Sequence, residues 1–268
     1  MSRPVITLTT DFGQADGYVG TMKGIILGIC PQATLVDISH KIRPQAVQQA
    51  AYVLSTAVPY FPPRTTHLVV VDPGVGSERR PIVVQTDQAA YVAPDNGVLT
   101  LALAQDPAHM AVQITAPRYR LSPVSATFHG RDVFAPAAAH LASGAEPREI
   151  GDVIPVTELV TLPSLQPQSE PDGYWQAQVL HVDRFGNLVT TMQVSTIKGQ
   201  GTSKYPRALI EVGGKQIAGL KRTFADVEQG DLVAYVGSSG YLEIAVREGN
   251  AAERLGAGVG DPVSVRIR

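Results

Sequence analysis

The sequence predicts an α/β protein in two parts: an N-terminal, mainly parallel α/β sandwich domain and a smaller C-terminal β-barrel domain. In the first half, strand-like runs alternate with segments of helical period, an order typical of a parallel sheet. Prolines then punctuate residues 155–171. Beyond them, short strand-like runs are separated by glycine-rich turns, a pattern typical of a small barrel or sandwich. We therefore place the domains at residues 1–160 and 173–268.

The overall composition argues against several classes of protein. The chain has 268 residues, a formal net charge of -2 and 44% hydrophobic residues, so neither a nucleic-acid partner nor a charged membrane surface is indicated. No apolar run is long enough to span a bilayer, and no signal peptide precedes the first strand-like run. The single cysteine, Cys30, excludes an intrachain disulfide. We expect a cytoplasmic protein.

The first domain begins with a β-α-β-α-β order. Strands are expected at 5–9 and 34–38, and apolar residues recur at helical spacing over 18–29. Pro44 is expected to open a second helix that continues to residue 57, and a β-branched run ends at Asp72. Right-handed crossovers would make these strands parallel neighbours.

The rest of the first domain carries two further motifs. After a strand pair at 82–86 and 90–93 comes the turn Pro94-Asp95-Asn96-Gly97, which precedes a short helix over 98–104. His129 stands just before Gly130 and an alanine-rich helix. Because of this position, we do not expect His129 to be packed inside a helix or strand.

The second domain is expected to be built from strands. The runs that alternate or are β-branched are 176–182, 188–191, 208–212, 232–236, 241–246 and 263–267. Two of its turns are polar: Asp183-Arg184-Phe185-Gly186-Asn187 and Gly237-Ser238-Ser239-Gly240-Tyr241. Such turns can present functional side chains on a rigid sheet.

The segment around Asp72 is the strongest candidate for chemistry. Its carboxylate stands at the C-terminal tip of a buried strand, and ligands of open α/β sheets bind outside such tips. Gly74 and Gly76 follow and allow backbone to approach a ligand, and Arg79 comes next. The alternative interpretation is a structural turn that Asp72 caps.

Together with His129, this segment offers a carboxylate, a guanidinium and an imidazole near one sheet edge. Asp72, Arg79 and His129 could position and deprotonate a water molecule. From the second domain, Phe185, Asn187 and Tyr241 suit an aromatic base, because stacking and a two-sided amide contact can hold adenine.

Metal and cofactor chemistry is poorly supported. The six histidines lack a ligand spacing, and there is no Walker sequence and no G-x-S-x-G elbow. Asp11 and Asp16 could hold a divalent cation, as in nucleoside hydrolases, although their spacing matches only loosely.

Several motifs together resemble one family. They are Thr10-Asp11-Phe12-Gly13, Asp72-Pro73-Gly74-Val75-Gly76 with Arg79-Arg80, Pro94-Asp95-Asn96-Gly97, Phe128-His129-Gly130-Arg131-Asp132 and Asp183-Arg184-Phe185-Gly186-Asn187. They look like those of S-adenosyl-L-methionine (SAM) hydroxide adenosyltransferases, also called adenosylmethionine hydrolases, which are relatives of the fluorinase and chlorinase. The resemblance implies hydrolysis of SAM to adenosine and L-methionine by in-line attack of water or hydroxide at C5′. It also implies a homotrimer with active sites at subunit interfaces, and no metal or cofactor.

The resemblance also implies roles for individual residues. Asp72, Arg79 and His129 match the water-activating triad. Arg80 could take the role of Arg79, but the family spacing favours Arg79. The residues implied to bind substrate are Asp11 at the ribose, Asp16, Asp183 and Ser238 at the methionine moiety, and Phe185, Asn187, Tyr241 and Val246 at the adenine. Thr191, Ser239 and Arg247 depart from the family pattern, which bears on binding of the methionine end.

Three alternatives stay open. A halogenase of the same fold would have Tyr in place of Asp72, Ser in place of Gly130 and a long insertion after the third strand, none of which is present. A metal-dependent nucleoside hydrolase and a non-enzymatic adenosine-binding protein are the other two. Product analysis with SAM distinguishes all of them.

Overall fold

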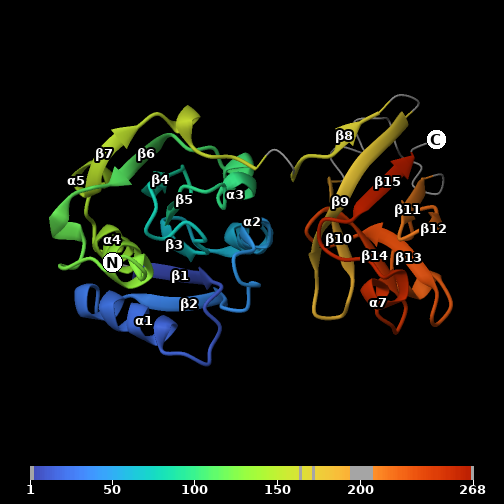
Figure 1. The fold of residues 1–268 in the computed structure, drawn as a ribbon, viewed down its shortest axis with the longest axis horizontal. Coiled ribbons are helices and arrows are strands. Elements are labelled where there is room, and N and C mark those ends of the chain that lie inside the picture. Colours follow the sequence, from blue (N-terminus) through green and yellow to red (C-terminus); the bar gives the residue numbers. More distant parts are fainter. Residues whose placement is uncertain (1–2, 163–164, 171–172, 194–207, 267–268) are drawn as a thin grey trace. The chain divides into compact units, whose positions relative to one another are not determined.

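The computed structural model describes residues 3–162, 165–170, 173–193 and 208–266. The chain divides into two compact units, Met1–Leu162 and Pro163–Arg268 (Figure 1). Each unit has its own sheet and its own hydrophobic core. Among the described residues, no helix is long and apolar enough to cross a membrane.

The first unit is built on a seven-stranded mixed sheet. Its strands are β1 (Val5–Thr10), β2 (Thr34–Ser39), β3 (Thr65–Val70), β4 (Pro81–Gln85), β5 (Ala89–Pro94), β6 (Met110–Ile114) and β7 (Gly151–Ile154), in the order β2-β1-β3-β5-β4-β6-β7. Strands β2, β1, β3 and β5 pair in parallel, which the β-α-β-α-β order predicts for the first three of them. The pairs β5–β4, β4–β6 and β6–β7 are antiparallel.

Helices cover both faces of this sheet. They are α1 (Tyr18–Ile29), α2 (Val47–Ala57), α3 (Thr100–Gln105), α4 (Ala135–Ala142) and α5 (Pro147–Ile150), with 3₁₀ turns at Val58–Tyr60, Pro117–Tyr119 and Val156–Glu158 and a π-helical turn at Gly130–Phe134. Alternate residues of the central strand β3 enter different cores. Leu68 and Val70 pack with α1 and α4, whereas Val69 packs with α2 and α3. This is the predicted α/β sandwich.

One predicted boundary differs for a physical reason. Helix α2 begins at Val47 rather than at Pro44. Gln45 lies at φ +67, outside the helical region, and its N–H donates to the Asp11 carboxylate over 2.8 Å. The residues before α2 therefore hydrogen-bond to the loop after β1 instead of extending the helix.

The second unit is a nearly closed antiparallel barrel. Its strands are β8 (Gln168–Ser169), β9 (Tyr174–Val182), β10 (Leu188–Gln193), β11 (Leu209–Val212), β12 (Lys215–Ala218), β13 (Leu232–Val236), β14 (Tyr241–Val246) and β15 (Pro262–Arg266), in the order β12-β11-β15-β9-β10-β14-β13, with β8 beside β9. The outer strands β12 and β13 contact each other, and Lys221 donates its N–H to the carbonyl of Ala234. The predicted barrel is thus confirmed.

A short helix and a 3₁₀ turn complete the second unit. Helix α7 (Ala251–Leu255) is capped by Asn250, whose side chain accepts the Glu253 N–H, and ends at Gly256 in the left-handed region. The 3₁₀ turn is Phe224–Asp226. Both elements are too short to produce a helical period, so sequence analysis does not find them.

Candidate active site

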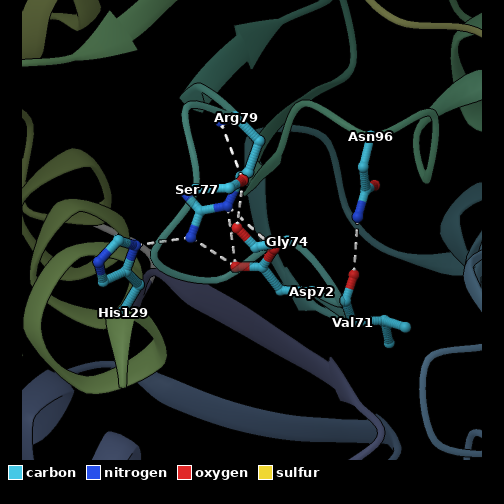
Figure 2. A network of polar contacts seen from close by, with 7 residues as sticks. All are labelled: Val71, Asp72, Gly74, Ser77, Arg79, Asn96 and His129. Atoms are coloured by element: carbon cyan, nitrogen blue, oxygen red, sulfur yellow. Dashed lines mark hydrogen bonds and ion pairs between the residues drawn. The ribbon is translucent and has the colours of Figure 1, made fainter. Parts of the chain in front are cut away.

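A tight loop carries Asp72 away from the central strand β3. The side-chain amide of Asn96 donates to the carbonyl of Val71 over 2.9 Å and so fixes the strand's tip (Figure 2). The chain then turns, because the N–H of Val75 bonds to the carbonyl of Asp72 and that of Ser77 to the carbonyl of Gly74. The loop returns toward β4 with Arg79 facing Asp72.

Two glycines in this loop are required by close contacts. A Cβ on Gly74 would lie 3.1 Å from Cγ of Arg79. Gly76 has φ +79, and a Cβ there would lie 2.7 Å from the carbonyl oxygen of Ala126. At Gly76 the loop therefore packs directly on the backbone that leads to His129, whereas a side chain at Gly74 would press on Arg79 within the same loop.

Asp72 and Arg79 form a nearly buried ion pair. Nε of Arg79 donates to both Asp72 oxygens, over 2.9 and 3.0 Å, and Nη2 donates to Oδ2 over 2.5 Å. Their side chains are 5% and 9% exposed, respectively. The Arg79 guanidinium also lies 5.1 Å from the centre of the Phe134 ring. Removing one partner of such a pair costs about 3–5 kcal/mol, since an uncompensated charge stays buried.

The same arginine reaches His129. Nη2 of Arg79 lies 2.6 Å from Nδ1 of His129 (Figure 2). A guanidinium can only donate hydrogen bonds, so Nδ1 must be the acceptor. The neutral imidazole then carries its proton on Nε2, which leaves Nε2–H as a donor. The three predicted triad residues are thus brought together in one network by Arg79.

The surroundings keep His129 neutral. Burial lowers the pKa of His129, and the Arg79 charge lowers it further, whereas Asp72 and Asp132 act in the opposite direction. His129 precedes a π-helical turn in which the N–H of Ala135 bonds to the carbonyl of Gly130, five residues back. Such wide turns often occur at functional sites.

The neighbouring Arg80 is held elsewhere. Its Nε and Nη2 donate to Asp95 over 2.9 and 2.6 Å, and Nη2 also donates to the carbonyl of Glu158. The hydrogen bonds to Asp95 raise the pKa of Arg80. Of the two arginines, Arg79 is therefore the one that contacts Asp72 and His129.

Asp132 has a structural role that the sequence does not predict. It is buried and accepts hydrogen bonds from Arg131, over 2.6 and 2.9 Å, and from the Ser125 N–H. The bond from Arg131 lowers the pKa of Asp132. This carboxylate joins the π-helical turn to the loop before it.

The loop after β1 contributes carboxylates and an aromatic cluster. Asp11 is half-buried and accepts the Gln45 N–H, whereas Asp16 is exposed. The rings of Phe12, Tyr18 and Phe128 lie 5.1–5.9 Å apart. Sequence analysis missed this cluster because its members come from separate segments.

Gly130 lies beneath the aromatic cluster. A Cβ on this residue would lie 3.2 Å from Phe128 and 3.3 Å from Phe12. A serine at this position, the halogenase pattern, would crowd both rings. The packing of the cluster therefore fits glycine.

The second unit has a pocket of about 870 Å³. Five residues predicted to bind substrate line it: Asp183, Phe185, Asn187, Ser238 and Val246. Tyr241 is not among the lining residues. It is buried, and its hydroxyl accepts a hydrogen bond from Gln193 over 2.8 Å.

Asp183 organises the turn that forms one wall of this pocket. Oδ1 accepts the N–H groups of Phe185 and Asn187, and Oδ2 accepts the Asn187 side-chain amide over 2.8 Å. The turn leaves Phe185 75% exposed. A large aromatic surface is thus held ready to stack on a planar ligand.

The structure shows the contacts of two residues that depart from the family pattern, Thr191 and Arg247. Thr191 is buried, and its hydroxyl accepts the N–H of Gln178. Arg247 lines the pocket and donates to the carbonyl of Val227 over 2.7 Å. Phe224, Tyr235 and Glu243 also line the pocket, although sequence analysis did not single them out.

The residues described hold no group of three or more His, Cys, Asp or Glu side chains that could bind a metal ion. Asp11 and Asp16, which could have formed such a site, are not joined by a third ligand of this kind.

Comparison with known proteins identifies the family. The family model for the SAM hydroxide adenosyltransferase N-terminal domain matches residues 6–151, and that for the C-terminal domain matches residues 177–264. The chain belongs to the SAM hydroxide adenosyltransferase family. The resemblance found in the sequence motifs is confirmed.

Individual relatives are consistent with membership of this family. The chain is 44% identical to the (R)-S-adenosyl-L-methionine hydrolase of Thermus thermophilus, over 97% of this chain and 98% of that protein. A fluorinase from an Actinoplanes species is 28% identical, over 90% of each chain. The crystal structure of an uncharacterized conserved protein from Thermotoga maritima has a TM-score of 0.89 and 35% identity, covering 98% of this chain and 100% of that one.

The Arg79–His129 contact predicts how His129 titrates. Arg79→Gln removes a charge that lowers the pKa of His129, so that pKa should rise; Asp72→Asn removes one that raises it, so the pKa should fall. Titration of the His129 ring signals by NMR measures both shifts, with Arg118→Gln, an exposed arginine, as the control. Equal pKa values in all four proteins would contradict the contact.

Proposed function

We propose that this protein is an enzyme that hydrolyses SAM to adenosine and L-methionine by in-line attack of water or hydroxide at C5′. The observation that carries the proposal is the network in which Arg79 bonds to both Asp72 and His129. The name of the Thermus relative, at 44% identity over nearly its full length, supports the same reaction.

The sulfonium of SAM leaves as a neutral thioether and needs no acid, so the difficulty lies in the nucleophile. We assign to Arg79 and to Nε2–H of His129 the role of donors that stabilise hydroxide character on the attacking oxygen. Asp72 balances the charge of Arg79 and holds it in place. In this tautomer Nε2 has no free lone pair, so within the triad the proton of an attacking water would go to the Asp72 carboxylate, whereas attack by hydroxide needs no acceptor. Loss of one such donor typically costs about 10²–10³-fold in rate.

The substrate-binding residues are part of the proposal. Asp11 would bind the ribose hydroxyls and Asp16 the methionine moiety. In the pocket of the second unit, Phe185 and Asn187 would hold the adenine beside Val246, and Ser238 would contact the methionine moiety. Asp183 would also contact the methionine moiety, in addition to organising the turn.

The alternatives fit less well. Asp72 stands where a halogenase would have tyrosine, and a serine in place of Gly130 would crowd the rings of Phe12 and Phe128. A nucleoside hydrolase would need a metal ion, so complete loss of activity in EDTA would favour that alternative.

We further propose that the protein is a cytoplasmic homotrimer with active sites at subunit interfaces. The family resemblance supports the trimer, and the division of the assigned residues between two compact units supports shared sites. A chain with one cysteine, which is buried, suits a reducing compartment.

The triad assignment predicts three inactive variants. Asp72→Asn, Arg79→Ala and His129→Ala should each lower kcat by about 100-fold or more, because each disrupts the network around the nucleophile. Adenosine affinity should change little, since the adenine pocket lies in the second unit. Chromatography of products and calorimetry with adenosine measure the two effects.

Arg80→Ala is the matched control for these variants. It should lower the melting temperature through Asp95 and leave kcat near that of the wild type. Normal turnover by all three triad variants would refute the assignment. Loss of adenosine binding along with activity would instead indicate a role in folding or in binding alone.

Direct attack predicts inversion at C5′. The one thiol, Cys30, is buried at the end of α1, so no thiol stands ready to form a covalent intermediate. Hydrolysis in ¹⁸O-water of SAM made chiral with deuterium at C5′ should give labelled adenosine of inverted configuration. Labelled adenosine with retained configuration would require a double displacement.

Shared sites predict complementation. Asp72→Ala removes a residue of the first unit and Asn187→Ala one of the second, so each homotrimer should be inactive. In mixed trimers, some sites would combine two intact units and SAM hydrolysis should return. Mixed trimers that form but stay inactive would place each complete site within one chain.

A further inference from the structure

The pocket of the second unit contains a carboxylate to which the mechanism gives no role. Glu243 lies in β14, opposite Tyr235 of β13 and Val189 of β10, and Val189 in turn faces His181 of β9. These residues form one row across the barrel on the same face. Glu243 and Tyr235 both line the pocket.

The contacts of Glu243 leave one oxygen open. The Tyr235 hydroxyl donates to Oε2 over 2.7 Å. Within the part of the chain that the structure describes, Oε1 accepts no hydrogen bond. A Cβ on Gly237 would fall on the carboxylate of Glu243, so this group lies directly against the turn that carries Ser238. The open oxygen thus belongs to the region that the proposed function gives to the methionine moiety.

The charges around Glu243 favour a cation. Burial raises the pKa of Glu243, and the charge of Asp183 raises it further, whereas the bond from Tyr235 lowers it. The other charged groups that line the pocket are Arg247 and Glu248. Arg247 is directed to the carbonyl of Val227 and lies 3.9 Å from Glu248. Two carboxylates close together in a half-buried place are stabilised by a cation that joins them.

We propose that Glu243 is a specificity-determining residue that binds the α-ammonium group of the methionine moiety of SAM through its open oxygen. This inference rests on the proposed function. An open carboxylate oxygen can accept a hydrogen bond from an N–H or O–H donor, and a charged donor binds it most strongly. The α-ammonium offers three donors and a positive charge, whereas the sulfonium offers no donor. A site that binds a cation here would favour SAM over adenosine, which carries no positive charge.

The test compares Glu243→Gln with the wild type. The KM for SAM should rise about tenfold, the scale of one charge-assisted hydrogen bond, and kcat should stay within about threefold. Affinity for S-adenosyl-L-homocysteine, which keeps the ammonium but lacks the sulfonium, should fall by the same factor. Inhibition by adenosine should not change. Glu211→Gln, an exposed strand glutamate of the same barrel, is the control and should behave as wild type.

Two further variants keep the carboxylate. Gly237→Ala should displace it and reproduce the rise in KM.

Tyr235→Phe removes the bond that lowers the pKa of Glu243, so this pKa should rise. The KM should stay normal at neutral pH. On acidification, it should begin to rise at a higher pH than in the wild type. The direction follows because protonation removes the charge that binds the ammonium. Glu243→Gln should lack this acidic limb.

Two outcomes would overturn the inference. An unchanged KM in folded Glu243→Gln would deny any contact with the substrate. An equal loss of SAM and adenosine affinity would assign Glu243 to the adenine or to folding. If the wild type binds SAM but does not hydrolyse it, the proposed hydrolysis is wrong. Calorimetry with SAM and adenosine on Glu243→Gln then still decides the role of Glu243.

Discussion

The nearly buried ion pair between Asp72 and Arg79 is the interaction on which the arrangement of the first unit's site depends. Asp72 is carried by the central strand and Arg79 by the returning loop, so the pair closes this loop. The bound guanidinium then holds His129 by its Nδ1 atom and lies against Phe134. One carboxylate therefore fixes the orientation of the arginine, the tautomer of the histidine and, through both, the donors that would face a nucleophile.

In the proposed reaction, the two units would have different chemical roles. The first unit holds a polar network at the tip of a buried strand, in which Arg79 is held by Asp72 and His129 and the Nε2–H of His129 stays available as a donor. The second offers an exposed aromatic ring, a turn organised by Asp183 and a carboxylate with an open oxygen. A nucleophile needs fixed donors in dry surroundings, whereas a large substrate needs surfaces on which to stack and pair. The barrel and the sandwich suit these different demands.

Sequence analysis could predict the α/β core, the barrel and the positions of Asp72, Arg79 and His129, because buried strands and glycine turns leave strong local patterns. It preferred Arg79 to Arg80 only on the family resemblance, since both follow the same turn and tertiary contacts are what separate them. The strands β6 and β7 were not predicted. Strand β7 is short, partly exposed and begins with glycine, so it has no strong strand pattern. Glu243 was missed because its surroundings come from strands that are distant in sequence.

The π-helical turn at Gly130–Phe134 constrains the length of the chain as well as its residues. It contains one more residue than an α-helical turn would. Removing any one residue there would restore the tighter winding and rotate the chain before it by about 100° about the helix axis. His129 would then point away from Arg79, although every side chain of the network was still encoded. In this segment, natural variation should therefore substitute residues freely at some positions but neither insert nor delete them.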